Sequence, residues 1–517
     1  MPDSDSADRM RPAPQLSVDL LIVGGGINGA GIARDAAGRG LRACLIEQSD
    51  LAAFTSSAST KLIHGGLRYL EHREFRLVRE ALAERERLLR IAPHLVHPLR
   101  FVLPHAPGSR PHWQIRLGLL LYDRLGGRGR LPASRAIDLR RDPAGAPLVD
   151  SCVKGFSYAD CSVDDSRLVL VNAMDAAERG AAILTRTRLI RARSGPEGWH
   201  AECACEEGER SLAIRAKAIV NAGGAWVNEI RHALGLGVPE PIRLVKGSHI
   251  VVPRLFEGEH AYILQNPDRR IVFAIPFERR FTLIGTTDVP WENGPDTARI
   301  SEEEIAYLCD SVNRYFGRAI APADVAWSYS GVRALRDDAS LEASEVTREY
   351  ELALERTAEG APVLSVIGGK ITTYRTLAQA ALAKLQPLVG GAQRCWTDSA
   401  ALPGGDLPQD SFAQFVEDAR RRWQHLPREL VSRLARSYGT RMERILEGAG
   451  SLDSLGDRFG ADLTAAEVEY MRRHEWALTV EDVLWRRSKL GLTVPADDAR
   501  RLEQFVRGMP ANTWRTA

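Results

Sequence analysis

The sequence predicts an α/β fold with a parallel sheet near the amino terminus, a second, antiparallel sheet, and a helical carboxyl-terminal region. Three observations support this prediction. A strand, a glycine-rich turn and a helix follow one another between Asp19 and Arg39, short strands recur between His249 and Gly285, and helical spacing replaces strands after Trp396. The 517 residues, 44% of them hydrophobic, are enough for two or three domains.

The glycine-rich turn is the most informative stretch. The strand Asp19 to Val23 runs into Gly24-Gly25-Gly26-Ile27-Asn28-Gly29, and a helix is expected from Ala30 to Arg39. In this GxGxxG spacing Gly24 permits a tight turn, Gly26 lets the backbone approach a pyrophosphate, and Gly29 lets the helix pack on the strand. The N–H groups at the start of the helix then hold the anion, so the turn predicts a dinucleotide site.

The next two segments extend this site. A second strand, Ala43 to Ile46, ends in Glu47, about 20 residues beyond the turn, where a carboxylate accepts a hydrogen bond from a ribose. The segment Asp50 to Tyr69 is rich in hydroxyl and glycine residues and has no clear period. Its serines and Thr60 can bind phosphate, and Gly65-Gly66 can admit a flat ring. A plain solvent loop would not carry so many apolar residues, so a cofactor-contacting loop is predicted.

Two charged segments follow. A helix from Glu74 to Arg90 carries Glu/Arg neighbours at helical spacing and is predicted to be a solvated face. The segment Leu99 to Arg135 holds seven arginines against the single acid Asp123, with a helix expected from His112 to Leu125 that is apolar over most of its circumference. Such a helix is typical of a protein that lies on an anionic lipid surface, although a buried helix with basic flanking turns is the alternative.

The middle of the chain contributes strand ends and cations. Lys217 to Trp226 is an apolar strand that ends in a small-residue turn, which in a doubly wound sheet faces the cofactor crevice. His249, Arg333, Arg348 and Lys370 lie beside Gly and Ser positions that are expected to be turns. Each could be an ordinary surface charge, but together they would supply what a phosphate dianion requires. Val363 to Thr373 resembles a strand that enters a helix at a glycine pair, where N–H groups stabilise negative charge.

Bulk properties limit the possible classes. The net charge of +2 gives no general attraction to nucleic acid, and seven cysteines without a CxxC pair argue for a reducing compartment and against zinc or another metal site. Residues 1–17 are expected to be a disordered tail and not a signal peptide, and no apolar run is long enough to span a bilayer. Residues 396–517 are predicted to be a separate α-helical domain, with helices at 411–423, 429–438, 464–474, 480–488 and 497–507.

Several motifs together resemble a known family. IVGGGINGAGIARDAAGRG, TSSASTKLIHGGLRYLEHREFRLVREALAER, VKGSHIVVPR, SGVRALRDD and IGGKITTYR are similar to the FAD-dependent, respiratory glycerol-3-phosphate dehydrogenases. The resemblance implies a glutathione-reductase-like FAD-binding Rossmann domain with an interleaved antiparallel substrate-binding sheet over residues 18–395. It also implies noncovalent FAD, a quinone such as ubiquinone as acceptor, and peripheral attachment to the inner face of the cytoplasmic membrane. A homodimer is a candidate assembly. GVRAL for GVRPL and NAGGAW for NATGPW are small departures.

The resemblance also implies site residues. Arg68, Tyr69, Arg333, Arg348 and Lys370 would bind the phosphate of sn-glycerol 3-phosphate, while hydride passes from C2 to flavin N5 and dihydroxyacetone phosphate forms. His249 is the preferred base because its ordinary pKa is near ~6.5, and Arg333 and Lys370 could polarise the nascent carbonyl. The residues expected to bind the cofactor are Gly24, Gly26, Ile27, Asn28, Gly29, Glu47, Thr55, Ser56, Ser57, Ser59, Lys61, Leu62, His64, Gly65, Gly66, Ala222, Gly223, Gly369, Lys370 and Thr372.

Two alternatives remain. The first is an oxidase of the same fold that uses O₂, or an enzyme acting on an amine or amino acid, which would need fewer arginines. The second is an FAD-containing RNA-modifying or RNA-binding protein that uses Leu99 to Arg135 as a basic patch. That patch offers few aromatic rings for stacking bases, so no nucleic-acid partner is expected.

Overall fold

The first sheet is built around five parallel strands that come from distant parts of the chain. The computed structural model describes residues 15–70, 73–105, 111–127, 129–205, 211–268, 270–337, 350–392, 394–408 and 411–509. Strand order is β17-β18-β10-β1-β2-β7, and β8 and β9 continue from β10 as an antiparallel extension. The strands are β1 (Gln15–Val23), β2 (Ala43–Ile46), β7 (Ala182–Leu184), β8 (Thr187–Gly195), β9 (Gly198–Cys205), β10 (Ser211–Asn221), β17 (Glu351–Arg356) and β18 (Pro362–Ile367).

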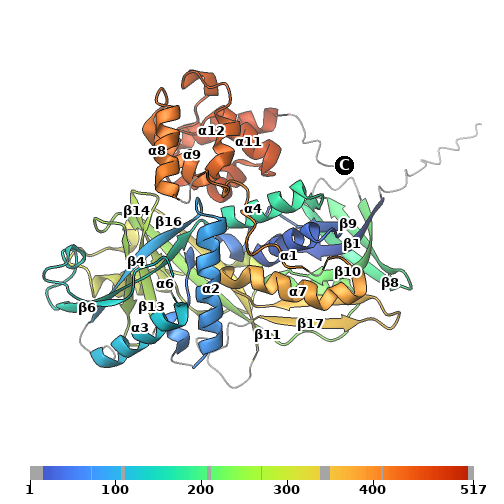
Figure 1. The fold of residues 1–517 in the computed structure, drawn as a ribbon, viewed down its shortest axis with the longest axis horizontal. Coiled ribbons are helices and arrows are strands. Elements are labelled where there is room, and N and C mark those ends of the chain that lie inside the picture. Colours follow the sequence, from blue (N-terminus) through green and yellow to red (C-terminus); the bar gives the residue numbers. More distant parts are fainter. Residues whose placement is uncertain are drawn as a thin grey trace, which may run out of the picture.

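Helices cover both faces of this sheet, as its continuous apolar strands require. On one face α1 (Ile27–Gly38) packs between α4 (Asp165–Glu178) and α7 (Tyr374–Val389), and this face forms one continuous apolar core with β1 and β10 (Figure 1). The short α5 (Val227–Ala233) and the β8–β9 extension close the other face. The carboxyl ends of the parallel strands therefore open toward the second sheet.

The second sheet is mixed and larger than predicted. Its order is β15-β11-β14-β13-β12-β4-β6-β3, with β16 beside β11 and β5 beside β6, and only β4 and β12 run parallel among its described pairs. The strands are β3 (Leu62–Ile63), β4 (Val96–His105), β5 (Arg135–Asp138), β6 (Lys154–Val163), β11 (Ile242–Pro253), β12 (His260–Gln265), β13 (Ile271–Phe277), β14 (Phe281–Gly285), β15 (Val289–Pro290) and β16 (Trp327–Arg336).

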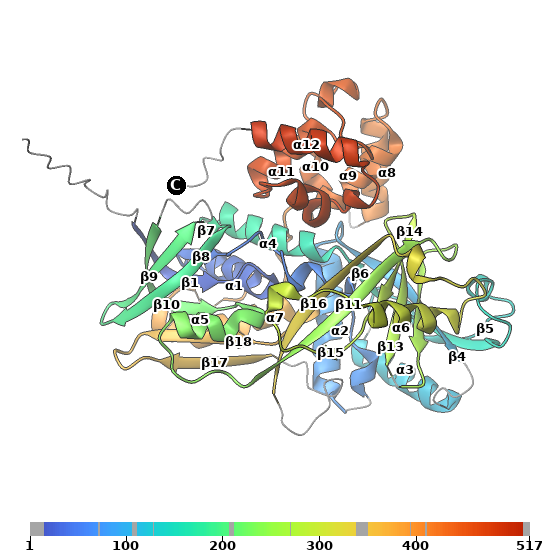
Figure 2. The same cartoon turned by 180° about the vertical axis from the view of Figure 1, so that it is seen from behind.

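Three helices cover the two faces of the second sheet. Helix α6 (Glu302–Asn313) lies on one face, where its buried residues join the core around Ile250 and Tyr262 (Figure 2). Helices α2 (Phe75–Ile91) and α3 (His112–Gly126) lie on the other face. The predicted extent of α3 is confirmed to within one residue.

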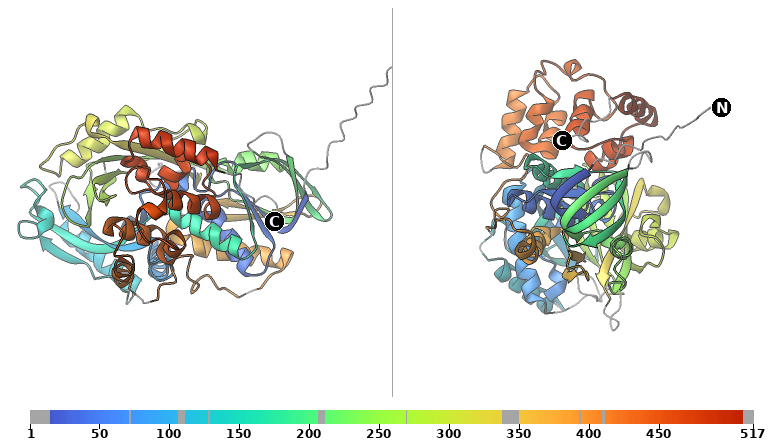
Figure 3. Two further views of the ribbon diagram at one scale, coloured as in Figure 1. Left: turned by 90° about the horizontal axis from the view of Figure 1, so that it is seen from above. Right: turned by 90° about the vertical axis from the view of Figure 1, so that its right-hand side faces the viewer.

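The carboxyl-terminal helices form a lobe with its own apolar core. They are α8 (Phe412–Arg422), α9 (Arg428–Tyr438), α10 (Met442–Ile445), α11 (Ala465–His474) and α12 (Ala496–Gly508), with a π-helix over Asp482–Arg487. The lobe sits over α4 in the view from above (Figure 3). The five predicted helical segments are confirmed, each with its ends shifted by at most two residues.

Three sequence-based predictions need correction. The helix after the glycine turn begins at Ile27 and not at Ala30. Gln15 to Ser17, placed in the predicted tail, are the first residues of β1 and pair with β10, while residues 1–14 lie outside the described residues. Helix α2 is no solvated face, because Glu84 and Arg85 are buried and bind Arg375 and Asp160. Charge alone could not reveal this, since the partners of both residues lie far along the chain.

Among the described helices, none combines the length and the apolar character needed to cross a bilayer.

Candidate active site

A cavity of about 710 Å³ opens where the carboxyl ends of the parallel strands face the second sheet. This is the crevice in which doubly wound sheets bind their ligands. Its wall combines the glycine turn, the end of β2, the segment after Phe54, the end of β10, strand β16 and the turn after β18. The predicted dinucleotide site and two of the predicted cations, Arg333 and Lys370, therefore line one cavity.

The glycine turn has the tight geometry that its spacing predicts. Gly24 adopts φ +118°, and a Cβ there would lie 2.5 Å from the carbonyl oxygen of Ala222. A Cβ on Gly29 would overlap the carbonyl oxygen of Gly24, so this glycine lets α1 pack against the turn. No acidic residue occupies the first turn of α1, and its positive end is therefore compatible with an anion.

Glu47 closes one end of the cavity. Its carboxylate accepts hydrogen bonds from the backbone N–H groups of Gly25 at 2.7 Å and Ser49 at 2.8 Å. Burial raises the pKa of this carboxyl, and the two N–H groups oppose that shift. Each carboxylate oxygen keeps a further lone pair, which is what a ribose hydroxyl requires. The position of Glu47 at the end of β2 is as predicted.

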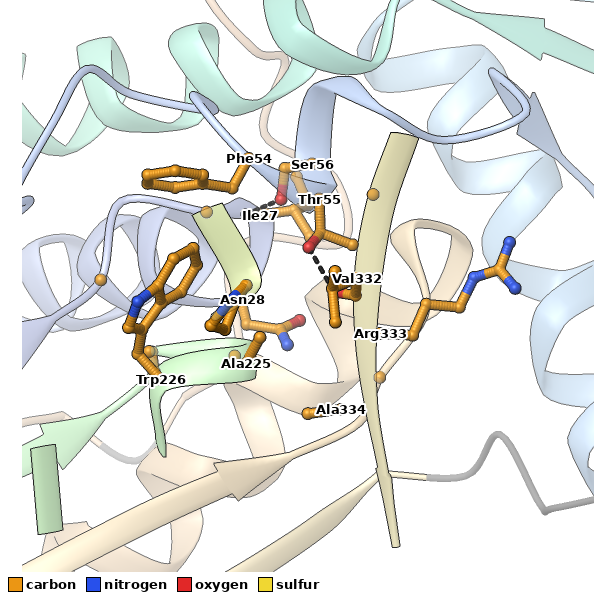
Figure 4. A pocket seen from close by; sticks show the side chains of 18 of the residues that line it. Ile27, Asn28, Phe54, Thr55, Ser56, Ala225, Trp226, Val332, Arg333 and Ala334 are labelled. Carbon is orange, nitrogen blue, oxygen red and sulfur yellow. Dashed lines mark hydrogen bonds between the residues drawn. The ribbon is translucent and has the colours of Figure 1, made fainter. Parts of the chain in front are cut away.

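The segment after Phe54 forms the part of the cavity wall next to the glycine turn. Ser56 Oγ accepts from the backbone N–H of Ile27 at 3.0 Å, and Thr55 Oγ1 donates to the carbonyl of Val332 at 2.6 Å (Figure 4). The segment is therefore tied to α1 on one side and to β16 on the other. Instead of a plain loop, it contains a 3-10 turn over Thr55–Ser57 and the short strand β3.

The side chain of Asn28 has a buried oxygen without a hydrogen-bond donor among the described residues. Its Nδ2 donates to the carbonyl of Gly368 at 3.1 Å, while its Oδ1 is buried and accepts no hydrogen bond from any described residue. Both atoms belong to a side chain that lines the cavity. Since a buried acceptor without a donor is costly, a hydroxyl or N–H group of a bound molecule is the expected partner.

Two of the predicted cations, Arg333 and Lys370, line the cavity with Tyr69. Arg333 Nη1 lies 2.6 Å from Asp288 Oδ1. A Cβ on Gly247 would come within 2.8 Å of Arg333 Nη2, so this glycine leaves room for the guanidinium. Lys370 Nζ lies 3.6 Å from the centre of the Tyr69 ring. The side chain of Arg68 and the whole of Arg348 lie outside the described residues.

His249 differs from its prediction. It lies within β11, completely buried, and it is absent from the cavity wall. Its Nε2 lies 3.0 Å from Thr60 Oγ1, and Thr60 does line the cavity. Burial, and next the charges of Arg333 and Lys61, hold the pKa of His249 well below its ordinary value. The environment of His249 is therefore not the ordinary one on which the prediction relied, and its role as the base stays a prediction.

This depressed pKa predicts how stability depends on pH. Below pH ~6.5 the unfolded chain protonates His249 and the folded chain does not, so the stabilising contribution present above ~6.5 is lost as the pH falls, with a slope that approaches about 1.4 kcal/mol per pH unit well below pH ~6.5. In urea unfolding with excess FAD, wild type is expected to lose about 1 kcal/mol more stability than His249→Asn between pH 6.5 and 5.5, because the unfolded His is only half protonated at pH ~6.5. Burial raises the pKa of Asp160 to about 6, which changes stability with pH in the opposite direction. This contribution is the same in both proteins, so it cancels when their losses of stability are subtracted. Equal losses in both proteins would show that His249 titrates normally.

Several predicted cofactor residues support the wall from outside. Lys61 turns away and binds the carboxylate of Asp165 at 2.8 Å, Ser57 donates to the carbonyl of Phe54, and the N–H of Gly65 donates to Tyr122. A Cβ on Gly66 would overlap the ring of Tyr69. These four positions are absent from the cavity wall, and their contact with the cofactor stays a prediction. The predicted residues that do line the cavity are Gly24, Gly26, Ile27, Asn28, Glu47, Thr55, Ser56, Ser59, Leu62, His64, Tyr69, Ala222, Gly223, Arg333, Gly369, Lys370 and Thr372.

Sequence reasoning missed an aromatic pair and an acid. Phe54 and Trp226 line the cavity with ring centres 4.4 Å apart, at the opposite side of the view from Arg333 (Figure 4). Trp226 ends the small-residue turn that was expected to face the crevice, and that placement could have indicated it. Asp288 carries no signal in the sequence, because its partner Arg333 is distant along the chain.

The comparisons with known proteins agree with this geometry. Residues 19–375 match the model of the FAD dependent oxidoreductases, and residues 395–513 match the model of the C-terminal domain of alpha-glycerophosphate oxidase. The structure is similar to that of glycerol-3-phosphate dehydrogenase from Bacillus halodurans complexed with FAD, with a TM-score of 0.73, 26% identity, and coverage of 95% of this chain and 89% of that one.

Curated relatives are considerably more similar in sequence. Glycerol-3-phosphate dehydrogenase of Pseudomonas aeruginosa is 54% identical over 94% of both chains. D-erythritol 1-phosphate dehydrogenase of Brucella abortus is 50% identical over 91% of this chain and 94% of the relative. Aerobic glycerol-3-phosphate dehydrogenase of Escherichia coli is 48% identical over 94% of this chain and 97% of the relative.

The cavity fits the cofactor that the matches imply. The glycine turn leaves room for a pyrophosphate, Glu47 faces the ribose position, and Asn28 Oδ1 lacks a donor. Fold and site thus define a flavoprotein oxidoreductase that holds FAD. Given the extent of the sequence identity, the chain belongs to the family of FAD-dependent glycerol-3-phosphate dehydrogenases.

Proposed function

We propose that the protein oxidises sn-glycerol 3-phosphate to dihydroxyacetone phosphate and passes the electrons to a membrane quinone. The observation that carries this proposal is that Arg333 and Lys370 line the same cavity as the glycine turn and Glu47, which form the dinucleotide site. A guanidinium and an ammonium provide the charge and the hydrogen-bond donors that a phosphate dianion needs. The relatives named glycerol-3-phosphate dehydrogenase support the same substrate.

Bound FAD supplies the acceptor for the hydride of the substrate. The chain's own residues orient the substrate: Arg333 and Lys370 bind the phosphate, Tyr69 packs against the ammonium of Lys370, and Arg68 and Arg348 remain proposed phosphate ligands. With the phosphate held there, the three-carbon chain extends along the cavity toward Thr60 and His64, which also line it.

The proton of the C2 hydroxyl needs an acceptor, and His249 lies directly behind Thr60. Thr60 Oγ1 would take the substrate proton as its own proton passes to His249 Nε2, so that the hydroxyl serves as a relay. Thr60→Val is expected to lower kcat about 10²-fold without weakening FAD binding. Anaerobic stopped-flow measurement of flavin reduction checks this, with Thr60→Ser as the variant that retains the relay. A Thr60→Val enzyme that reduces its flavin at the wild-type rate would contradict it.

One experiment distinguishes this function from its alternatives. Under anaerobic conditions the enzyme is mixed separately with sn-glycerol 3-phosphate, D-erythritol 1-phosphate, glycine or sarcosine, and the bleaching of the flavin is followed. We expect bleaching with glycerol 3-phosphate and then rapid reoxidation by a ubiquinone analogue. Faster bleaching by the four-carbon phosphate would favour the activity named for the Brucella relative, and faster reoxidation by O₂ would favour an oxidase.

We further propose that α3 lies on an anionic membrane surface, on the cytoplasmic side. Four of its large apolar residues face solvent, among them Trp113 at 69% and Leu117 at 59% exposure, with Leu120 and Leu121 beside them. Ile115, Leu119 and Tyr122 fill the other face of the helix and pack on the second sheet. An amphipathic helix with an outward apolar face and basic residues is typical of interfacial binding, and it places the reduced enzyme near the quinone.

Replacing Trp113 and Leu117 together by aspartate is expected to lower partitioning into anionic vesicles about tenfold or more, because buried apolar area and charge attraction are both lost. Vesicle co-sedimentation measures this, and flavin reduction in solution should be unchanged. The control is Val238→Asp, which alters a residue that is 73% exposed and lies away from α3. Equal partitioning of both variants would contradict the assignment of α3.

A further inference from the structure

One short segment of the carboxyl-terminal lobe contacts the turn and the helix that support the wall of the cofactor cavity. The π-helix Asp482–Arg487 and the turn after it carry three cations whose side chains are almost fully buried: Arg486, Arg487 and Lys489, exposed by 11%, 0% and 3%. Buried cations are rare unless they are paired, so each should have a defined partner. Each of the three also binds a group of the lobe itself, since Arg486 pairs with Asp482 and the carbonyls of Glu475 and Trp485 accept from Arg487 and Lys489, but each reaches across to the FAD-binding side as well.

Two of these cations bind a single acid, Asp50. Arg487 forms a two-pronged ion pair with it, in which Nη2 lies 2.9 Å from Oδ1, and Arg486 Nε lies 2.6 Å from Oδ2. Asp50 comes three residues after Glu47, in the turn that follows β2. Its own carbonyl accepts from the N–H of Ala53 at 3.1 Å, so the carboxylate and the turn move together.

The turn held by Asp50 is part of the cofactor cradle. The N–H of Ala52 donates to the carbonyl of Gly25 at 3.1 Å, which ties the turn directly to the glycine-rich segment. Ala52, Ala53 and Phe54 all line the cavity. A displacement of Asp50 would therefore move both the wall of the cavity and the backbone beside the pyrophosphate position.

The third cation holds the neighbouring part of the wall. Lys489 Nζ donates to Ser166 Oγ at 2.6 Å, at the start of α4. The adjacent Asp165 binds Lys61 and accepts from Ser59 Oγ at 2.7 Å, and Ser59 lines the cavity. The lobe thus supports two successive segments of the cofactor loop from outside.

We propose that Arg487 is a positioning residue for FAD: through Asp50, the carboxyl-terminal lobe clamps the turn after β2 against the glycine-rich segment and so retains the cofactor. Without Arg487 the buried carboxylate of Asp50 loses its two-pronged partner and keeps only Arg486, so the oxygen that Arg487 leaves reaches water only if the turn moves outward. The proposal rests on FAD as the cofactor and is independent of the substrate.

FAD release from the holoenzyme tests the clamp. Arg487→Met and Asp50→Asn are each expected to raise the dissociation constant for FAD about tenfold or more. The rise in flavin fluorescence when the holoenzyme is diluted measures this release. Amide hydrogen exchange of residues 48–54 should also become faster in both variants. Arg487→Lys keeps the positive charge but cannot form the two-pronged hydrogen bond of a guanidinium, so it should recover part of the affinity for FAD.

The matched control is Arg441→Gln. Arg441 also links the lobe to the FAD-binding region, through Glu178 at 2.7 Å, but it contacts the far end of α4 and not the cofactor loop. FAD affinity should not change in this variant.

The clamp would be refuted if Arg487→Met lost thermal stability but retained FAD with the wild-type constant and normal exchange over 48–54, because Arg487 would then only dock the lobe. If Arg487→Met does not fold, the nearly isosteric Asp50→Asn decides by the same two measurements. Failure of the flavin-bleaching experiment with glycerol 3-phosphate would leave these results unaffected.

Discussion

Arg333→Ala is expected to lower kcat/KM for sn-glycerol 3-phosphate about 10²- to 10³-fold, measured by anaerobic flavin reduction over a range of substrate concentrations. The variant removes a charge-assisted contact to the phosphate and leaves Asp288, 2.6 Å away, without this partner. Losing one member of a buried charged pair typically costs 2–5 kcal/mol, and about 1.4 kcal/mol corresponds to a factor of ten.

The control for this prediction lies three residues further along the same strand. Arg336→Ala removes an equally large cation of β16 that pairs with Glu351 and is absent from the cavity wall, so kcat/KM should remain within about threefold of wild type. Slow oxidation of unphosphorylated glycerol should fall far less in Arg333→Ala than oxidation of the phosphate ester. An unchanged kcat/KM in Arg333→Ala would remove the phosphate site from this end of the cavity.

Gly29→Ala is expected to weaken FAD binding about 100-fold or more, so that the purified protein is nearly colourless. The added methyl group would overlap the carbonyl oxygen of Gly24, and the backbone fixes the positions of both groups, so neither can rotate away. Relief requires the start of α1 to move off β1, which withdraws the N–H groups from the pyrophosphate. Flavin absorbance per protein and titration of the apoprotein with FAD measure the effect.

Gly118→Ala is the matched substitution for Gly29→Ala. Gly118 also lies in a helix, but no atom lies within 4 Å of its added Cβ, so FAD content should equal that of wild type. Circular dichroism distinguishes loss of FAD from loss of the fold. Gly29→Ala protein with a full complement of flavin would show that the turn does not cradle the pyrophosphate.

The elements that could be predicted from the sequence are those whose signals are local. The strand, glycine turn and helix between Gln15 and Gly38 lie within one continuous stretch, and each of the carboxyl-terminal helices carries its own periodic pattern. The order of the sheet was not accessible in this way. Strand β1 lies between β10 and β2, and β18 enters from beyond residue 361, because pairing depends on contacts between distant residues.

The site was predictable in part for the same reason. Residues beside the glycine turn, including Asn28 and Glu47, line the cavity as expected. His249 was expected to open a strand and Arg333 to lie at a turn, yet both lie inside longer strands, where alternation decides which side chain meets the cavity. Lys61 forms an ion pair with Asp165, and Arg333 forms one with Asp288. Both acids lie far from their partners in the sequence, so only the folded structure reveals these pairs.

The contact between Asp50 and Arg487 has a consequence for biosynthesis. The cradle begins to leave the ribosome with β1, but its sheet is completed by β18 and its outer support arrives only with residues 486–489. The nascent chain must therefore keep apolar strand edges covered through most of translation, a period in which chaperone binding protects such edges. Stable FAD loading should therefore follow the emergence of residues 486–489 from the ribosome.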